Sequence, residues 1–127
     1  MTLLLTHSSS LEHNAGQGHP ERPDRLRAVY AALEVPQFDS LIRREAPAAD
    51  MAQITRVHDQ LYADTLLAAV PKEGQVKIDP DTALSPASGE AALHAAGAMI
   101  AAVDAVVAGE ANTAFCAIRP PGHHAEP

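Results

Sequence analysis

The sequence has few aromatic residues, few basic residues and one cysteine, and each scarcity narrows the classes of protein it can belong to. Tryptophan is absent and aromatic residues make up 3% of 127 residues, against 46% apolar residues overall. A core must therefore be built from aliphatic side chains, which bury less area than rings do. The net charge of -7 argues against nucleic-acid binding, because that binding depends on clustered Lys and Arg; a cationic partner fits better.

The sequence predicts neither a disulfide framework nor a targeting segment. The single Cys116 cannot form an internal disulfide, and its apolar surroundings predict a buried, unreactive thiol. The opening "MTLLLTHSSS" lacks both the basic segment of a signal peptide and the length of a membrane span. We therefore expect a cytoplasmic protein with no membrane contact. The length predicts a single domain over residues 1–127.

Apolar runs alternate with helical patterns along the chain. Short apolar runs predict strands over 2–6, 40–46 and 113–118, and helical spacing predicts a helix over 23–34 and two short helices within 50–70, with Asp50 as an N-cap. Residues 7–22 and 71–86 are predicted to be long loops. Strands separated by helices indicate an α/β fold with a mainly parallel sheet.

The longest helical pattern begins at Ser85, predicted as its N-cap, and ends at Gly109. Pro86 occupies the expected first helical position, where a missing N–H costs nothing. The apolar stripe predicted for this helix consists of Leu93, Ala96, Ile100, Val103 and Val107.

The segment "RPPGHH" follows directly on the third predicted strand. Ligand sites of open α/β sheets lie beyond the carboxyl ends of the strands, so the position favours a functional role. Adjacent residues in extended backbone point in opposite directions. We therefore expect His123 and His124 to be poorly placed to hold one metal together and better placed as two separate proton carriers. Two solvent-exposed loop histidines without a role remain the alternative.

"IRPPGHHAEP" closely resembles the His-His motif of the histone deacetylase-like amidohydrolases, in the bacterial branch near class II deacetylases and acetoin-utilisation proteins. "GHPERPDRL" at 18–26 is similar to the family's first active-site loop, and "VHDQLY" and "DTALSPASGEAALHAAGA" resemble family segments in the same order. The resemblance implies the N-terminal part of an arginase-like α/β fold. It also implies a zinc-dependent hydrolase acting on acetyl-lysine or acetylpolyamine amides.

The same resemblance implies roles for individual residues. His123 would be the general base and His124 would manage the proton delivered to the leaving amine. Arg25 would line a cavity below the acetyl pocket, although an ordinary surface arginine is the alternative. Asp79 and Asp81 would lie on the rim that holds the substrate backbone, with a simple turn role equally open. Gly122 is assigned to the substrate-binding set with them.

The sequence departs from the family pattern in its metal ligands. The family takes its zinc from an Asp-x-His and a later Asp, and no Asp-x-His tripeptide occurs here. We therefore expect zinc in a full-length parent, no catalytic zinc in these 127 residues, and no activity from them alone. His13, His19 and Glu21 are weak metal candidates, and His7, His58 and His94 are expected to be structural.

A second hypothesis, from a different class, is a non-catalytic module. Such a protein would associate with itself or with a complementary C-terminal half. A three-stranded slice of a larger sheet exposes an unpaired edge, which is a template for such association.

Overall fold

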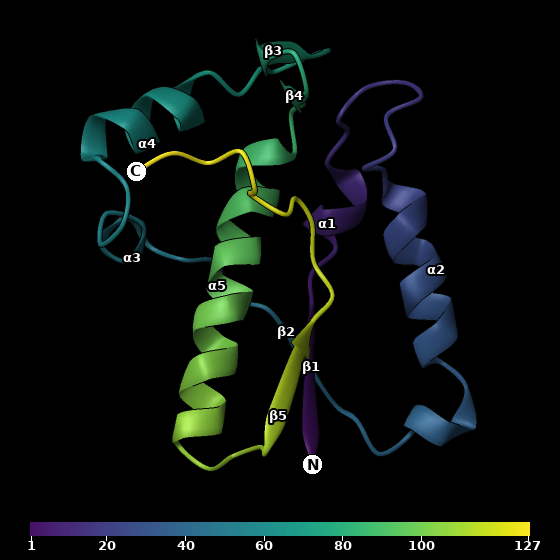
Figure 1. Cartoon of the computed structure of the whole chain (residues 1–127). Coiled ribbons are helices and arrows are strands. Elements are labelled where there is room, and N and C mark those ends of the chain that lie inside the picture. Colours follow the sequence, from purple (N-terminus) through teal and green to yellow (C-terminus); the bar gives the residue numbers. More distant parts are fainter.

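A computed structural model describes all residues 1–127 and has a three-stranded parallel sheet at its centre (Figure 1). The strand order is β2-β1-β5, with β1 spanning Thr2–Thr6, β2 Ile42–Glu45 and β5 Thr113–Cys116. Leu3 of β1 pairs with Ile42 on one side and with Ala114 on the other. The predicted strands and the mainly parallel sheet are confirmed.

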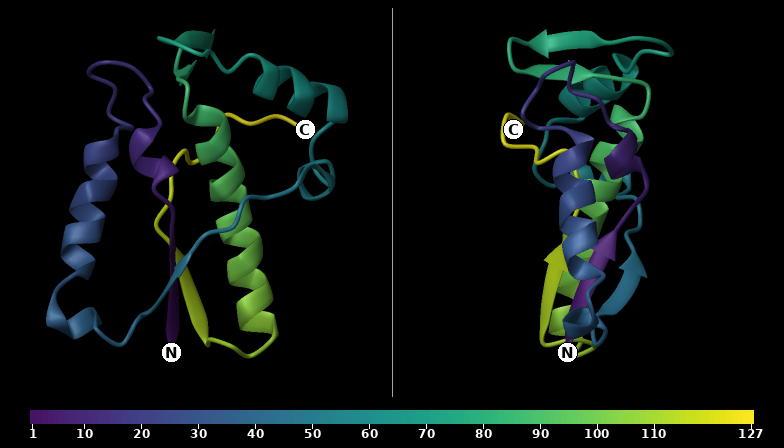
Figure 2. Two further views of the ribbon diagram at one scale, coloured as in Figure 1. Left: turned by 180° about the vertical axis from the view of Figure 1, so that it is seen from behind. Right: turned by 90° about the vertical axis from the view of Figure 1, so that its right-hand side faces the viewer.

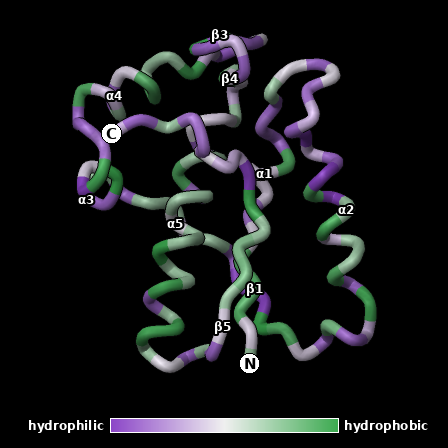
Figure 3. Tube along the Cα trace, in the orientation of Figure 1, coloured by the Kyte–Doolittle hydropathy of each residue, from purple (hydrophilic) through white to green (hydrophobic).

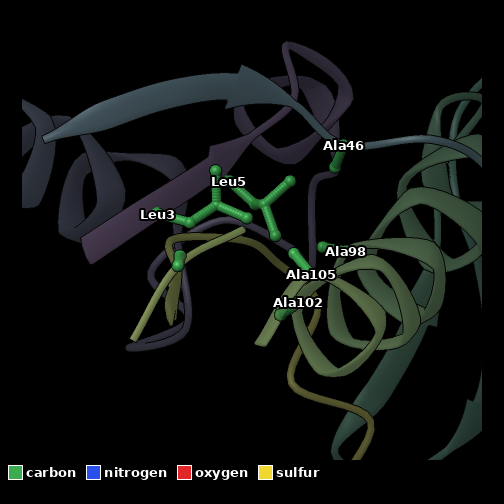
Figure 4. Close-up of a cluster of buried hydrophobic side chains, with 7 residues drawn as sticks. Leu3, Leu5, Ala46, Ala98, Ala102 and Ala105 are labelled. Carbon is green, nitrogen blue, oxygen red and sulfur yellow. The ribbon is translucent and has the colours of Figure 1, made fainter. Parts of the chain in front are cut away.

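Two helices cover opposite faces of this sheet, as the left panel of Figure 2 shows. Helix α2 spans Pro23–Leu33 and α5 spans Ser88–Val107. Successive side chains of a strand point to opposite faces. Leu3 and Leu5 accordingly pack against alanines of α5 (Figure 4), whereas Leu4 packs against Leu26 of α2.

The remaining elements are short. They are α1 (Ser9–Glu12), the 3-10 helix η1 (Pro36–Phe38), α3 (Met51–Ile54), α4 (Gln60–Ala68), and the antiparallel hairpin of β3 (Val76–Asp79) and β4 (Thr82–Leu84). The two predicted short helices are confirmed as α3 and α4. Asp50 caps α3 in a capping box with Gln53, in which each side chain accepts the other residue's backbone N–H.

Both predicted long loops were wrong in part, because each contains a short element. Residues 7–22 include α1, whose Ser9 and Ser10 are buried through hydrogen bonds to His7 and Arg119. Residues 71–86 include the β3-β4 hairpin. Neither element has an apolar periodicity in the sequence. Hydrogen bonds to Arg119 hold α1, and in the hairpin β3 is mostly exposed whereas Ala83 and Leu84 of β4 are buried.

The predicted apolar stripe of α5 was wrong. The residues it buries are small ones, namely Ser88, Ala91, Gly97, Ala98, Ala102 and Ala105. Val103 and Val107 are instead 55% and 83% exposed. A Cβ on Gly97 would lie 1.9 Å from the Pro47 carbonyl oxygen, so α5 uses its small residues to approach the neighbouring backbone closely.

The sequence predicted the C-terminal end of α5 correctly but placed its N-terminal end too early. Ser85 is not the N-cap, because the helix begins at Ser88 and Ser85 instead accepts the Ser88 N–H with its carbonyl oxygen. Gly109 does end the helix, at a φ of 77°. The N–H groups of Gly109 and Glu110 donate to the carbonyl oxygens of Val106 and Ala105, which is the Schellman arrangement.

Helix α5 is also long and apolar enough to cross a membrane, by length and composition alone. Figure 3 shows the apolar residues along it. Its alanine face packs against β1 as part of the core described above.

Candidate active site

The candidate site is built on Arg119, which follows β5 and is fully buried. Its Nη1 donates to the carbonyl oxygens of Ser10 (2.6 Å) and His13 (2.8 Å). Its Nε lies 2.7 Å and 3.0 Å from the two carboxylate oxygens of Glu21. Arg119 therefore connects the "RPPGHH" turn to α1 and to residues 13–22, the loop between α1 and α2, which is called the glycine-containing loop below.

No role was predicted for Arg119 from the sequence. The signal that could have found it is an arginine directly after an apolar strand, in a chain that has an acidic residue, Glu21, in the loop before the first long helix. A charged group in that position needs a partner, because burying an unpaired charge is costly. The backbone of Arg119 is fixed as well, since its N–H and carbonyl oxygen both bond to the Ser10 hydroxyl, at 3.1 Å and 3.2 Å.

Gly122 gives the turn its shape. Its φ of 74° lies in the left-handed region, which other residues rarely adopt, and its carbonyl oxygen accepts the Ala125 N–H at 3.0 Å. The turn places His123 and His124 at the surface. The assignment of Gly122 to a substrate site stays a prediction.

The two imidazoles lie close together, so the expectation that they diverge was wrong. Their ring centroids are 4.4 Å apart and the ring planes are inclined by 50°. The expectation assumed an extended backbone, whereas His123 and His124 occupy a turn, in which the alternation of a strand does not apply.

Asp81 links this turn to two other segments. One carboxylate oxygen of Asp81 lies 3.2 Å from Nε2 of His124, and the other lies 3.0 Å from Nε2 of His19. The hairpin between β3 and β4 presents Asp81, and the glycine-containing loop presents His19. The predicted rim aspartate is thereby brought together with one of the predicted proton carriers.

Asp79 has a turn role in this structure. Its Oδ1 accepts the Asp81 backbone N–H at 2.7 Å. That bond, and next the Thr82 side chain, lower the pKa of Asp79, and His124 adds a smaller effect in the same direction. Whether Asp79 also contacts substrate stays a prediction.

A cavity of about 420 Å³ lies beside this group. The glycine-containing loop forms one wall, including Gly16 and His19, and the hairpin forms the other, including Lys77 and Asp81. The cavity therefore adjoins the carboxylate that bridges His19 and His124.

The structure separates the other predicted site residues. Arg25 is exposed on α2, and its cavity role stays a prediction. His13 is buried and bonds to the Ser88 hydroxyl at 2.6 Å. Its pKa is lowered by burial and, to a lesser extent, by Arg119. His13, His19 and Glu21 have different partners and form no common metal site.

Cys116 is the last residue of β5 and packs against the core on the α5 side. It is half-buried, so the prediction of a buried thiol was wrong. Burial raises the pKa of its thiol. A thiol with a raised pKa is a poor nucleophile near neutral pH, so no nucleophilic role for Cys116 is indicated.

A metal at the turn would compete with proton transfer. One ligand atom each from Asp81, His123 and His124 lies within 4.8 Å of the others, and all three residues are exposed. A catalytic zinc takes about three protein ligands and leaves one position open. Such an ion here would occupy both imidazoles and leave neither as a proton carrier, so these residues do not fit the zinc site that the resemblance implies.

The family model and the similar proteins of known sequence all point to the same family. Residues 19–127 match the model of the histone deacetylase domain. The chain is 38% identical over 114 residues to the histone deacetylase-like amidohydrolase of Pseudomonas aeruginosa, covering 89% of this chain and 30% of that protein. It is 34% identical over 130 residues to a probable deacetylase of Archaeoglobus fulgidus, covering 100% of this chain and 36% of that protein.

The fold has a similar solved structure. The HD domain of HDA15 matches with a TM-score of 0.84 and 28% identity, over 98% of this chain and 36% of that one. The chain thus spans 30% to 36% of the length of these relatives.

Proposed function

The chain belongs to the histone deacetylase family, and from that premise we propose that the protein carrying these residues hydrolyses acetyl-amide bonds. The proposed substrates are acetyl-lysine residues within lysine-containing peptides, or acetylated polyamines. The acetylated amine itself is neutral, but the unacetylated amines of such molecules are cationic, which suits the net charge of -7. The observation that carries the proposal is the pair His123 and His124 beyond the carboxyl end of β5, with Asp81 on His124.

The residues of this chain would act as proton carriers. Amide hydrolysis needs a base that takes a proton from the attacking water and an acid that protonates the leaving amine. We assign the first role to His123 and the second to His124. The Asp81 carboxylate lies 3.2 Å from Nε2 of His124 and holds the ring in its orientation.

We propose that the activity depends on zinc, which would polarise the amide carbonyl and lower the pKa of its bound water. The family's Asp-x-His ligand sequence is absent from these residues. The ion would therefore be held by residues other than these 127, and the roles proposed above concern only proton transfer.

The test replaces His124 by Ala in the protein at its natural length and measures hydrolysis of an acetyl-lysine peptide. Loss of one acid-base group lowers turnover by roughly 10²-fold or more. Lys72→Ala, an exposed position away from the turn, is the matched control and should leave turnover unchanged. Wild-type turnover in the His124 variant would remove this imidazole from the mechanism.

A second candidate function rests on exposed apolar side chains. Val103 and Val107 of α5 and Phe115 of the edge strand β5 face solvent. Exposed apolar patches beside a free strand edge are typical of association surfaces. The alternative proposal is a non-catalytic module that associates with itself or with a complementary C-terminal half.

A further inference from the structure

A second group of histidines lies apart from the "RPPGHH" turn. His7 follows the carboxyl end of β1, and His94 lies on the face of α5 that meets the sheet. Their rings stack with centroids 3.4 Å apart and planes inclined by 7°. Both side chains are mostly buried, with 9% and 15% of their surface exposed.

The hydrogen bonds of His94 fix where its free lone pair lies. Nδ1 lies 2.9 Å from the Ala46 carbonyl oxygen. A carbonyl oxygen only accepts, so Nδ1 carries the proton and the neutral ring has its lone pair on Nε2. That Nε2 faces Oε1 of Glu90, 3.7 Å away and one helical turn earlier. Two acceptors that face each other leave room for a cation between them.

Nδ1 donating to a backbone carbonyl is also how metal-binding histidines are oriented. The spacing of Glu90 and His94, four residues apart on α5, places both side chains on one face of the helix.

His7 can present Nε2 in the same way. Its Nδ1 lies 2.7 Å from the Ser9 hydroxyl, which can accept a proton from Nδ1 as well as donate to it. In this structure the Ser9 backbone N–H donates to Nδ1 at 3.1 Å, and Nε2 lies 3.3 Å from Glu45. Cation binding at Nε2 requires the other tautomer, in which Nδ1–H donates to the Ser9 hydroxyl and the bond from the Ser9 backbone N–H is given up.

The charge around the stack is negative and has no permanent cation to balance it. Glu45 and Glu90 each form an ion pair only with an imidazole. The arginines beside Glu45 have other partners, since Arg43 pairs with Glu34 and Arg44 pairs with Glu110. Two carboxylates beside two imidazole rings form a site whose negative charge a divalent cation would neutralise.

We propose that His7, Glu90 and His94 bind a divalent transition-metal ion such as Zn²⁺, at a site distinct from the proton carriers His123 and His124. One ligand atom from each of the three residues lies within 4.8 Å of the others. Ligands about 2.0–2.2 Å from a tetrahedral zinc are roughly 3.3–3.6 Å apart. The exposed Glu90 side chain is free to rotate and close the difference.

The ligand chemistry selects the type of ion. Imidazole nitrogens suit Zn²⁺, Ni²⁺ and Cu²⁺, whereas Ca²⁺ and Mg²⁺ prefer all-oxygen sites. An entry path exists as well, because a cavity of about 410 Å³ opens beside His7. Arg43 and Arg44 also line this cavity, and their guanidinium groups are paired with Glu34 and Glu110. Glu45 lines it too, with Oε1 3.3 Å from Nε2 of His7.

The experiment titrates Zn²⁺ by calorimetry into the chelator-treated chain of 127 residues, which lacks the proposed catalytic zinc ligands, and does not involve deacetylase activity. We expect one site that excess Mg²⁺ does not displace. His94→Ala and Glu90→Gln should each weaken zinc binding by about tenfold or more. Glu90 is exposed, so Glu90→Gln tests the ligand without disturbing the core. Circular dichroism of each variant checks that the fold is retained.

The double variant His123→Ala, His124→Ala is the matched control, because the turn offers its own ligand atoms with Asp81. It should retain the high-affinity zinc site. Zinc binding that is lost in this control and unchanged in both His94→Ala and Glu90→Gln would overturn the proposal, as would the absence of zinc binding in the wild type. Either result would leave the proposed deacetylase function untouched.

Discussion

Arg119 and Glu21 form an ion pair, with Nε of the arginine 2.7 Å from a carboxylate oxygen and only 16% of the Glu21 side chain exposed. The pair joins the residue after β5 to the loop before α2 across 98 positions of sequence. It therefore fixes the start of the His-His turn against the loop that carries His19.

Glu21→Ala should destabilise the fold strongly, because it leaves the buried Arg119 guanidinium without its carboxylate. Breaking a buried pair by removing one partner costs about 3–5 kcal/mol. Urea unfolding followed by circular dichroism measures the change in the free energy of unfolding. Glu34→Ala removes the carboxylate of the exposed pair with Arg43 and should cost about 1 kcal/mol or less. Equal losses in the two variants would show that Arg119 does not depend on Glu21.

Gly97→Ala should also destabilise the protein, because the added Cβ would meet the Pro47 carbonyl oxygen at 1.9 Å. Overpacking of this kind costs about 1–3 kcal/mol. Thermal unfolding provides the measurement. Gly89→Ala is a control on the same helix and should change stability much less. Its Cβ would meet only side-chain atoms, those of Val70 at 3.2 Å and Leu67 at 3.6 Å, and no backbone atom. An unchanged melting temperature for Gly97→Ala would contradict the close approach of α5.

The type and order of the main helices and strands could be predicted from the sequence, whereas the residues through which they pack against one another could not. Leu3, Leu4 and Leu5 form an apolar run too short for a useful helix, and their burial as a central strand follows from that run. The buried face of α5 could not be predicted the same way. Alanines lie all around this helix, and the side that meets the sheet is chosen by how closely the backbones can approach, which Gly97 permits.

In the candidate site, too, the position of the motif could be predicted from the sequence, but the contacts between distant residues could not. The motif at 119–124 located His123 and His124 at a strand end, because that position depends only on local order along the chain. The contacts of Asp81 with His19 and His124 join residues 62 and 43 positions apart through a hairpin with no apolar periodicity. Arg119 was missed for a similar reason, since only its partners show that it is buried.

Stability should fall as the pH is lowered from neutral, and His13 should contribute to the fall. Burial lowers the pKa of His13 below its ordinary value of 6.5. Between that value and the lowered one, the unfolded chain binds a proton that the native protein does not, so the free energy of unfolding decreases as pH falls. Urea unfolding at pH 7.5 and pH 5.5 measures this. His13→Asn does not titrate and should reduce the dependence; an identical slope would exclude His13 as a source.

The apolar surface of β5 tests the association alternative. A sheet of order β2-β1-β5 leaves the outer edge of β5 unpaired, and Phe115 on that strand is 49% exposed. If this surface drives self-association, sedimentation velocity should show a species larger than the monomer whose fraction rises with concentration. Phe115→Lys should shift it towards monomer, because a charged residue on an edge strand opposes pairing. Val57→Lys, at an exposed apolar position between α3 and α4, should not. A protein that is monomeric at all concentrations would contradict self-association. The non-catalytic hypothesis would then require association with a complementary C-terminal half.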